Sequence, residues 1–372
     1  MKIAIVTITN GANYGNRLQN YALQTVLQNM GHEVETLRML TSKEFFCMTS
    51  VKYKCKTVLK TILKKSSHKI YNQRKIRFNS FNDKNIVFSP YSVKCSAAPK
   101  VLNEQYDLFV CGSDQVWNPR IPLIKEALGA YLCDFAQDSK RTAYAASFAT
   151  GDVPPEFEEK FKSELPGFKC ISLREESGKA LVKKLCGIDA PVVLDPTMLL
   201  NAEQWRKIEK KPDYIKNEKF IVTYFLAGRK GALGDYIEKI RNEFNADLII
   251  NLDFEFLDDK KIENPEHFNT DPSEFLWLID HAECMLTDSF HGSVFSILFH
   301  TPFCVFERQE VEKGNNMSSR ITTLLGKFGL EECKDSLSSP KKIPQFSGSD
   351  KVEDVLSKER KTSLAYLENA VK

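Results

Sequence analysis

The sequence of 372 residues contains no run of about 20 apolar residues, the length that a membrane-spanning helix requires. Its ten cysteines include no Cys-x-x-Cys pair and no cluster of metal ligands is visible, so we expect neither a zinc ribbon nor a dithiol redox site nor any bound metal. Several cysteines stand inside apolar runs, where a free thiol packs as a small hydrophobic group. The short apolar start of the chain does not have the pattern of a signal peptide. These absences together predict a cytoplasmic protein.

An excess of charge of one sign is also missing, because the formal net charge is only +3, and this gives no indication of nucleic-acid binding. Residues 51–78 are the exception, with ten Lys or Arg and no acidic residue, while the rest of the chain has 42 basic and 49 acidic residues. Apolar residues recur at helical spacing among these lysines, which predicts a basic amphipathic helix within an insert at about 45–82. It is either a solvated helix lying across its domain or a peripheral contact with the anionic inner face of the plasma membrane.

Short β-branched or aromatic runs alternate with helical patterns along the whole chain, which is typical of βαβ units around a parallel sheet. The length and this alternation predict an α/β fold of two Rossmann-like domains facing each other across a cleft, with residues 1–196 in the first, residues 197–372 in the second, and a final amphipathic helix at about 352–371. The predicted strands are residues 3–7, 33–37, 108–111, 142–147, 170–173 and 192–194, then 219–226, 247–252, 284–287 and 303–306. Ligands of such sheets bind beyond the carboxyl ends of the strands.

Two polar loops follow predicted strands in the first domain. The first has glycines at Gly11 and Gly15 alone, so the dinucleotide-binding pattern Gly-x-Gly-x-x-Gly is absent, although a helix N-terminus after such a loop still favours anions. The second follows residues 108–111 and offers hydrogen-bonding groups and a tryptophan, which presents a flat face to a sugar ring or base, or else fills the seam between domains. From the second loop we expect Ser113, Asp114, Gln115, Trp117 and Asn118 at the cleft. The first loop, with Asn13, Asn16 and Arg17, is either part of the cleft wall or a glycine-containing turn with helix caps.

Arginines follow predicted strands or begin predicted helices at two further positions. Arg174 comes directly after residues 170–173, where its planar guanidinium suits a carboxylate or phosphate. An ordinary ion pair with Glu175 or Glu176 explains it equally well. Arg320 stands at a predicted helix start and is either an anion ligand or a solvated side chain.

His291 lies where the predicted strand 284–287 gives way to a helix that begins near Gly292, with Ser289 or Asp288 as its cap. The backbone donors of Gly292 and Ser293 would hold an anion there. A helix N-terminus lowers the pKa of a histidine and a bound anion raises it, so His291 is a candidate acid or base near neutral pH. A structural histidine is the simpler alternative.

Seven short motifs occur in order along the chain: NYGNRLQNYALQ, GSDQVWN, YAASF, ISLREESG, LDPT, TDSFHGSVFSILF and SSRI. Together they resemble the polysaccharide pyruvyl transferase family over about residues 1–330, apart from the basic insert. The resemblance implies a GT-B-like fold and an enzyme that transfers a pyruvyl group from phosphoenolpyruvate to a sugar of a bacterial surface polysaccharide or its lipid-linked precursor. It implies no metal and no cofactor beyond phosphoenolpyruvate as co-substrate.

By this resemblance, His291 is the favoured acid or base, Arg174 and Arg320 bind the anionic groups of the donor, and Asp114 orients or deprotonates the acceptor hydroxyl. The chain departs from the family where relatives carry an arginine two positions before the histidine, because Ser289 stands there. Arg17, Arg308 and Arg320 are the candidates to supply the missing charge. Two alternatives stay open: a GT-B glycosyltransferase that uses a nucleotide sugar, and a non-catalytic glycan-binding protein of the same fold.

Overall fold

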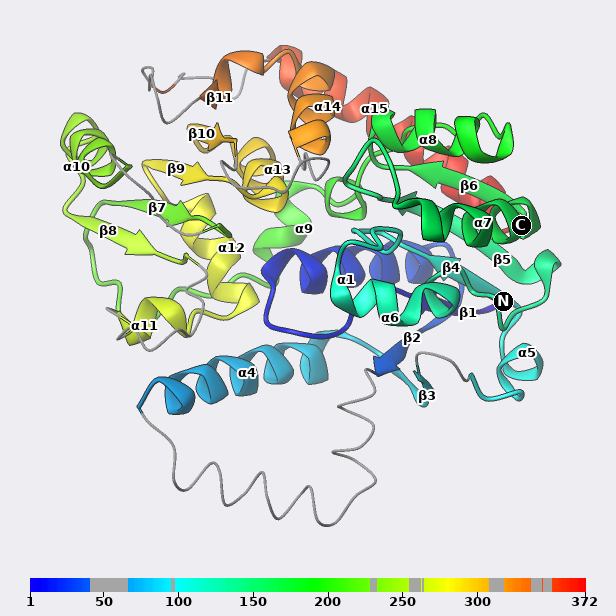
Figure 1. Cartoon of the computed structure of the whole chain (residues 1–372). Coiled ribbons are helices and arrows are strands. Elements are labelled where there is room, and N and C mark those ends of the chain that lie inside the picture. Colours follow the sequence, from blue (N-terminus) through cyan, green and yellow to red (C-terminus); the bar gives the residue numbers. More distant parts are fainter. Residues whose placement is uncertain are drawn as a thin grey trace.

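A computed structural model of the chain shows two parallel β-sheets, each flanked by helices (Figure 1). It describes residues 1–40, 66–94, 98–227, 233–253, 262, 264–307, 318–335, 343 and 350–372. The first sheet has the strand order β3-β2-β1-β4-β5-β6, the order of a Rossmann fold. Its strands are β1 (Lys2–Val6), β2 (Glu33–Leu40), β3 (Phe88–Lys94), β4 (Leu108–Cys111), β5 (Arg141–Ala146) and β6 (Cys170–Leu173).

The second sheet has the order β11-β10-β9-β7-β8, and all its pairings are parallel. Its strands are β7 (Phe220–Tyr224), β8 (Leu248–Asn251), β9 (Cys284–Thr287), β10 (Phe303–Phe306) and β11 (Lys334–Asp335). We call the parts of the chain around the two sheets the first lobe and the second lobe. Both lobes are the parallel α/β units that the alternation of strand and helix patterns predicts.

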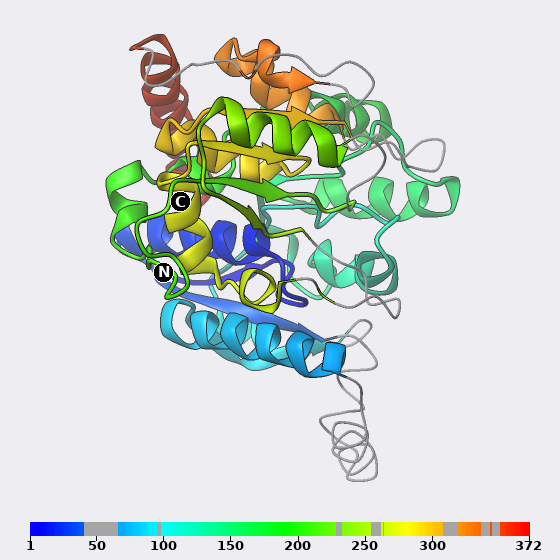
Figure 2. The same cartoon turned by 90° about the vertical axis from the view of Figure 1, so that its left-hand side faces the viewer.

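Helices cover the sheets on both faces and fill the space between the lobes (Figures 1 and 2). They are α1 (Tyr14–Asn29), α4 (Ser66–Asn85), α5 (Leu102–Gln105), α6 (Pro122–Tyr131), α7 (Pro155–Glu164), α8 (Glu176–Cys186), α9 (Ala202–Arg206), α10 (Leu233–Glu243), α11 (Pro265–Phe268), α12 (Pro272–Asp280), α13 (Phe290–Phe299), α14 (Ser318–Phe328) and α15 (Asp350–Ala370). Among the described residues, none of these helices has the length and apolarity that crossing a bilayer demands.

Alternation along β1 explains how the first sheet joins both its own core and the second lobe. Ile3 and Ile5 belong to a buried apolar cluster that runs through α1 and continues into α12 and α13 of the second lobe. Ala4 and Val6 point to the opposite face, into a separate cluster beneath α6, α7 and α8. Since successive side chains of a strand face opposite ways, one strand contributes to both cores. The lobes therefore share a continuous apolar seam.

The last helix returns to the first lobe. Figure 1 shows α15 (red) extending from α14 toward β5 and β6. The hydroxyl of Ser363 accepts a hydrogen bond from the backbone N–H of Leu194 at 3.0 Å, and Thr142 donates to the carbonyl of Ala370 at 3.2 Å. Two Rossmann-like lobes with a returning C-terminal helix form the predicted GT-B-like arrangement, so the fold class is confirmed.

Several boundaries differ from the sequence predictions. Residues 192–194 form an isolated bridge between Val192 and Leu173 instead of a strand, because the chain turns at Asp195 to start a 3-10 turn at Pro196–Met198. The strands β3 and β11 were not predicted. Asp271 caps α12 by accepting from two backbone N–H groups, with Pro272 in the first position, as its sequence indicates.

Only part of the basic insert lies within the described residues. The predicted amphipathic helix with Lys52, Lys54, Lys56, Lys60, Lys64 and Lys65 falls outside them, so its membrane contact stays a prediction. The described part is α4, which contacts α11 and α12 of the second lobe and lies below α1 (Figures 1 and 2). Here Arg74 is buried and Arg77 forms ion pairs with Asp271 and Glu274. These two cations therefore join the lobes and do not belong to a free basic face.

Candidate functional site

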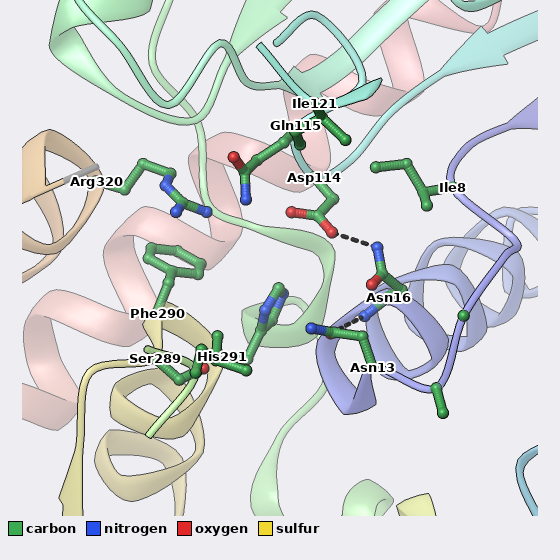
Figure 3. A pocket seen from close by; sticks show the side chains of 13 residues that line it. Ile8, Asn13, Asn16, Asp114, Gln115, Ile121, Ser289, Phe290, His291 and Arg320 are labelled. Atoms are coloured by element: carbon green, nitrogen blue, oxygen red, sulfur yellow. Dashed lines mark hydrogen bonds between the residues drawn. The ribbon is translucent and has the colours of Figure 1, made fainter. Parts of the chain in front are cut away.

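A cavity of about 350 Å³ lies between the two lobes. Loops after β1 and β4 form its wall on one side, and the start of α13, the end of β7 and the start of α14 form the other (Figure 3). Its lining residues are Ile8, Gly11, Ala12, Asn13, Asn16, Asp114, Gln115, Ile121, Leu226, Ser289, Phe290, His291 and Arg320. The structure thus brings together seven of the predicted site residues: Asn13, Asn16, Asp114, Gln115, Ser289, His291 and Arg320.

His291 is in the first turn of α13, and its imidazole crosses the seam toward the first lobe. A Cβ atom on Gly15 of α1 would be 2.0 Å from its Nδ1 atom, so only a glycine fits beside the ring. Its Nε2 atom is buried, has no hydrogen-bond partner among the described residues, and lies 3.8 Å from a carboxylate oxygen of Asp195. An unpartnered buried nitrogen on a pocket wall is an unusual arrangement for a structural histidine.

Charged groups of both signs surround His291. Burial lowers the pKa of His291, while the carboxylates of Asp195 and Asp114 oppose this and Arg174 and Arg320 reinforce it. The net direction is downward, so the neutral imidazole dominates at neutral pH. An anion bound near the arginines would cancel part of their effect and favour the protonated form.

Asp114 projects into the pocket from the loop after β4. Its backbone φ angle is +71°, a left-handed conformation that aspartate tolerates better than most side chains. One carboxylate oxygen accepts from Asn16 Nδ2 at 2.5 Å and the other from Arg174 Nη2 at 3.2 Å. The carboxylate is therefore fixed in position on the pocket wall, in the place the sequence predicts.

Arg174 does not line the pocket but lies behind it. Its side chain is buried and forms ion pairs with Asp195 at 2.8 Å and Asp114 at 3.2 Å. Burial disfavours its charge, yet the two carboxylates outweigh this and raise the pKa of Arg174. The predicted pair with Glu175 or Glu176 is wrong, since sequence neighbours on a turning chain point apart. Direct donor binding by Arg174 stays untested, because this guanidinium is already engaged.

Ser289, Gly292 and Ser293 form a closed helix start. Ser289 caps α13 by accepting from the backbone N–H of Gly292 at 3.3 Å, and the N–H of Ser293 donates to the carbonyl of Ser289 at 3.1 Å. The two donors predicted to hold an anion are therefore used within the helix, and that expectation is corrected. Asp288 is not the cap, because it accepts from Leu226 and Ala227 at the end of β7.

Four residues predicted to line the cleft lie elsewhere. Trp117 is fully buried in the first lobe against Phe148 and Phe168, so it reaches neither a ligand nor the seam. The other three are buried too and serve the loops: Ser113 donates to Asp195, Asn118 donates to Gln115, and Arg17 donates to the carbonyl of Gly11. Polar side chains of a tight loop commonly form hydrogen bonds that hold the loop in place. Burial lowers the pKa of Arg17 to about 10.

Phe290 and Asp195 are functional candidates to which the sequence analysis assigned no role. The ring of Phe290 lines the pocket, with the guanidinium carbons of Arg174 and Arg320 at 4.4 and 5.8 Å from its centre. Cations over an aromatic face are held there by the ring quadrupole. Asp195 is the Asp of the LDPT motif, which marked it in the sequence. Its contact with His291 depends on tertiary structure.

A three-residue group of potential metal ligands lies outside the pocket, at Glu209, Asp280 and His281. No cluster was visible in the sequence because Glu209 is distant along the chain from the adjacent Asp280 and His281. Arg206 already pairs with both oxygens of Asp280, at 2.8 and 2.9 Å. A metal would have to displace this arginine, so the donor set does not point to a metal centre.

The fold and the pocket define a two-lobed α/β protein whose candidate site lies between its lobes. The family model described as polysaccharide pyruvyl transferase matches residues 13–310, most of the chain. The chain therefore belongs to the polysaccharide pyruvyl transferase family and is a transferase of polysaccharide biosynthesis. Its arginine-free Ser-Phe-His sequence at 289–291 lies within the matched region.

Comparison with curated proteins gives no match. Among solved structures, the UDP-GlcNAc 2-epimerase from Neisseria meningitidis bound to UDP-GlcNAc is 12% identical, with a TM-score of 0.45 and coverage of 99% of this chain and 100% of that one. A putative UDP-N-acetylglucosamine 2-epimerase from Listeria monocytogenes is 10% identical, with a TM-score of 0.48 and coverage of 90% and 89%. The E. coli ADP-heptose LPS heptosyltransferase II is 10% identical, with a TM-score of 0.37 and coverage of 99% and 100%.

Proposed function

We propose that this transferase moves the pyruvyl group of phosphoenolpyruvate onto a sugar of a bacterial surface polysaccharide or its lipid-linked precursor, forming a pyruvate ketal and releasing phosphate. The observation that carries the proposal is the position of His291, on the wall of the interlobe pocket of a chain that belongs to this family. Phosphoenolpyruvate has a phosphate and a carboxylate, and Arg320 on the same wall supplies a cation for one of them. No cofactor beyond this co-substrate is required.

The proposed reaction forms two C–O bonds at the same carbon, first by an addition and then by a substitution. A sugar hydroxyl first adds across the enol double bond: its oxygen bonds to the phosphate-bearing carbon, and its proton is delivered to the methylene carbon, which becomes a methyl group. A second hydroxyl then displaces the phosphate, whose departing oxygen takes up that hydroxyl's proton. The methylene carbon needs a proton donor and the attacking hydroxyl a proton acceptor, so one group that alternates between the two forms can serve both.

His291 fits this alternating role because its environment acts on both protonation states. Burial and the arginine charges favour the neutral base in the free protein, and a bound anion that offsets the arginines favours the acid. Asp114 is fixed on the facing wall by Asn16 and Arg174, where it accepts a hydrogen bond from the acceptor hydroxyl and orients it. The neighbouring apolar wall of Ile8, Ile121 and Leu226 limits access of water to the reacting carbon.

The proposal is tested by phosphate release from phosphoenolpyruvate in the presence of candidate acceptor glycans. We expect His291→Asn to lower the rate about 100-fold or more, the usual contribution of a general acid or base. His300→Asn is the matched control, because His300 ends the same helix and contacts Glu353 instead of the pocket. Equal turnover of the His291 variant and the wild type would contradict the mechanism.

Thermal unfolding with added ligands separates the donor classes. A ligand that binds the native state stabilises it by RT ln(1 + [L]/Kd), which raises the unfolding temperature. Phosphoenolpyruvate is expected to stabilise the wild type and not the Arg320→Met variant. Stabilisation by a nucleotide sugar alone would favour the glycosyltransferase alternative, and stabilisation by a glycan alone would favour a non-catalytic binding protein.

A further inference from the structure

Asp195 is a buried carboxylate at the junction of the two lobes. It follows the bridge at Val192 and begins the turn at Pro196–Met198 that leads into the second lobe. Its Oδ1 atom accepts from the backbone N–H and the hydroxyl of Thr197 at 3.0 and 2.7 Å. Its Oδ2 atom accepts from Ser113 Oγ and Arg174 Nη1, both at 2.8 Å. Four donors hold this side chain in one orientation.

Nearby positive groups and a backbone N–H keep Asp195 ionised. Burial opposes its charge, but His291, Arg174 and the N–H of Thr197 together lower the pKa of Asp195 to about 2. The carboxylate is therefore negative at any pH at which the enzyme is expected to work. A fixed buried charge of this kind acts strongly on the nearest group that can change its own charge.

That nearest group is His291. The Nε2 atom of His291 lies 3.8 Å from Asp195 Oδ2, too far for a hydrogen bond but within 1 Å or so of one. It is buried and has no partner among the described residues. The two residues come from different lobes, and the carboxylate oxygen is the anion that faces this nitrogen across the seam.

The Nδ1 edge of the imidazole packs against Gly15. A methyl group at this position would stand 2.0 Å from Nδ1, so the lack of a side chain at Gly15 is what lets the ring occupy this place. Asn13 and Asn16, on either side of Gly15 along the chain, both line the pocket. The imidazole thus has one nitrogen directed at a carboxylate and the other beside the pocket wall.

Besides Asp195, three charged groups face His291: Asp114 on the loop after β4, Arg174 at the end of β6 and Arg320 in α14. Asp114 favours the imidazolium, and the arginines disfavour it. Arg174 is already paired with both carboxylates. The carboxylates are therefore the groups that favour the imidazolium, and the removal of one of them should lower the pKa of His291 further.

We propose that Asp195 is a positioning residue for His291. Its carboxylate accepts the Nε2–H of the imidazole across the seam between the lobes, which leaves Nδ1 as the nitrogen that exchanges its proton with the substrate. The inference rests on the proposed function for its catalytic consequence. The pairing itself does not, because it concerns two side chains of the free protein. Asp195 stays ionised throughout and touches no substrate atom.

The test is a titration of the six histidines in ¹⁵N-labelled protein, with His291 assigned from the His291→Asn variant. In the wild type we expect the neutral ring to carry its proton on Nε2. In Asp195→Asn the pKa of His291 should fall by about 1 or more, the usual effect of losing an opposite charge at this range. Asp195→Ser, which keeps a capping oxygen for Thr197, should give the same result and guards against misfolding of the first variant.

Asp335→Asn is the matched control, because Asp335 is a buried carboxylate in β11 that does not line the pocket. It should leave the pKa of His291 unchanged. In the transfer assay, the Asp195 variants should lose about tenfold or more in kcat while KM for phosphoenolpyruvate changes little, since the carboxylate acts through the imidazole. A purely structural role would instead lower stability in both the Asp195 and Asp335 variants and leave the titration of His291 as it is.

A proton on Nδ1 in the neutral wild type, or a pKa of His291 that is unaltered in a folded Asp195 variant, would overturn the proposal. A failure of the Asp195–His291 pairing can be distinguished from a failure of the proposed function. If the titration behaves as expected but phosphoenolpyruvate is not turned over, the pairing stands and the proposed function falls. If turnover is found but the titration is unaffected, the opposite holds.

Discussion

Two groups of buried polar side chains lie at the seam between the lobes, and they differ in kind. Behind the pocket, Arg174 is paired with the carboxylates of Asp114 and Asp195, beside an imidazole nitrogen that lacks a partner among the described residues. On the α4 side, Arg74 donates to neutral oxygens of Tyr14, Ala12 and Phe268. The imidazole of the first group can change its charge with pH or ligand, whereas the second group has no such freedom. The pocket side is suited to proton chemistry and the α4 side to holding the lobes together.

Aromatic rings complete the α4-side contacts. The guanidinium of Arg74 lies 4.8 to 4.9 Å from the rings of Tyr14, Phe78 and Phe268, and Tyr14 in turn stacks on Phe275 at 4.2 Å. The rings come from both lobes. A cation solvated by ring faces and carbonyls costs less to bury than an unpaired one. Ala12 also lines the pocket, so this support extends to the site.

The largest effect is expected on the pocket side, from Arg174→Met. This change leaves the carboxylates of Asp114 and Asp195 buried without their cation, which typically costs about 3–5 kcal/mol. Urea unfolding at pH 7 measures it. Because the pKa of Asp195 in the folded wild type is about 2, the ionised carboxylate stabilises the fold at every pH above the ordinary pKa of an aspartate. This contribution is lost as the pH falls toward 2. The deficit of the variant should therefore shrink below about pH 4. A deficit that is independent of pH would show that the ion pairs are not its cause.

A smaller loss of stability is expected on the α4 side, from Arg74→Met. Methionine keeps much of the packing among the rings, so the loss is that of charge-assisted hydrogen bonds, about 2–3 kcal/mol. The deficit should be independent of pH, since every acceptor is neutral. Ile76→Ser, on the exposed face of the same helix, is the control and should change stability by less than about 0.5 kcal/mol. If Arg74→Met were no worse than this control, the α4-side contacts would not join the lobes.

The smallest effect concerns Glu209, which lies in a groove beside α4 with Arg77 and Lys84. Burial and the nearby Asp280 raise the pKa of Glu209 to about 7. A raised carboxyl pKa means that the folded state binds more protons, so this contribution is fully present at pH 4 and is lost as the pH rises through 7. Glu209→Gln should remove that loss and gain about 1 kcal/mol between pH 5 and pH 8, after allowance for solvent screening. If the free energies of unfolding of the wild type and the variant changed with pH in the same way, this prediction would be refuted.

The fold was predictable to a large extent because its signals are local. The runs at β4, β6, β9 and β10 contain only a few residues each, yet all of them are buried on both faces and therefore read as continuous apolar segments. The cap and proline at Asp271 and Pro272 likewise act within one turn of chain. The strands β3 and β11 were missed because they lie at sheet edges, where polar residues interrupt the pattern.

The candidate site was predicted less completely. Motif positions placed His291, Asp114 and Arg320 at one pocket, since strand ends on one edge of a sheet meet in space. Trp117 and Asn118 stand beside them in the sequence and yet point into the core or the loop. The direction of a side chain on an irregular loop depends on backbone angles that the sequence pattern does not reveal, as the positive φ of Asp114 illustrates.

By itself, the sequence determined the two-lobed parallel architecture, the family and the place of His291 at the start of a helix after a strand, because each of these follows from short-range patterns and ordered motifs. Only the tertiary structure decided which charges face one another. Asp195 and His291 are 3.8 Å apart, and Arg74 reaches the carbonyl of Phe268, across stretches of chain that carry no shared pattern. Such contacts arise when separate elements pack, and electrostatic interactions depend on distance in space, not on distance along the chain.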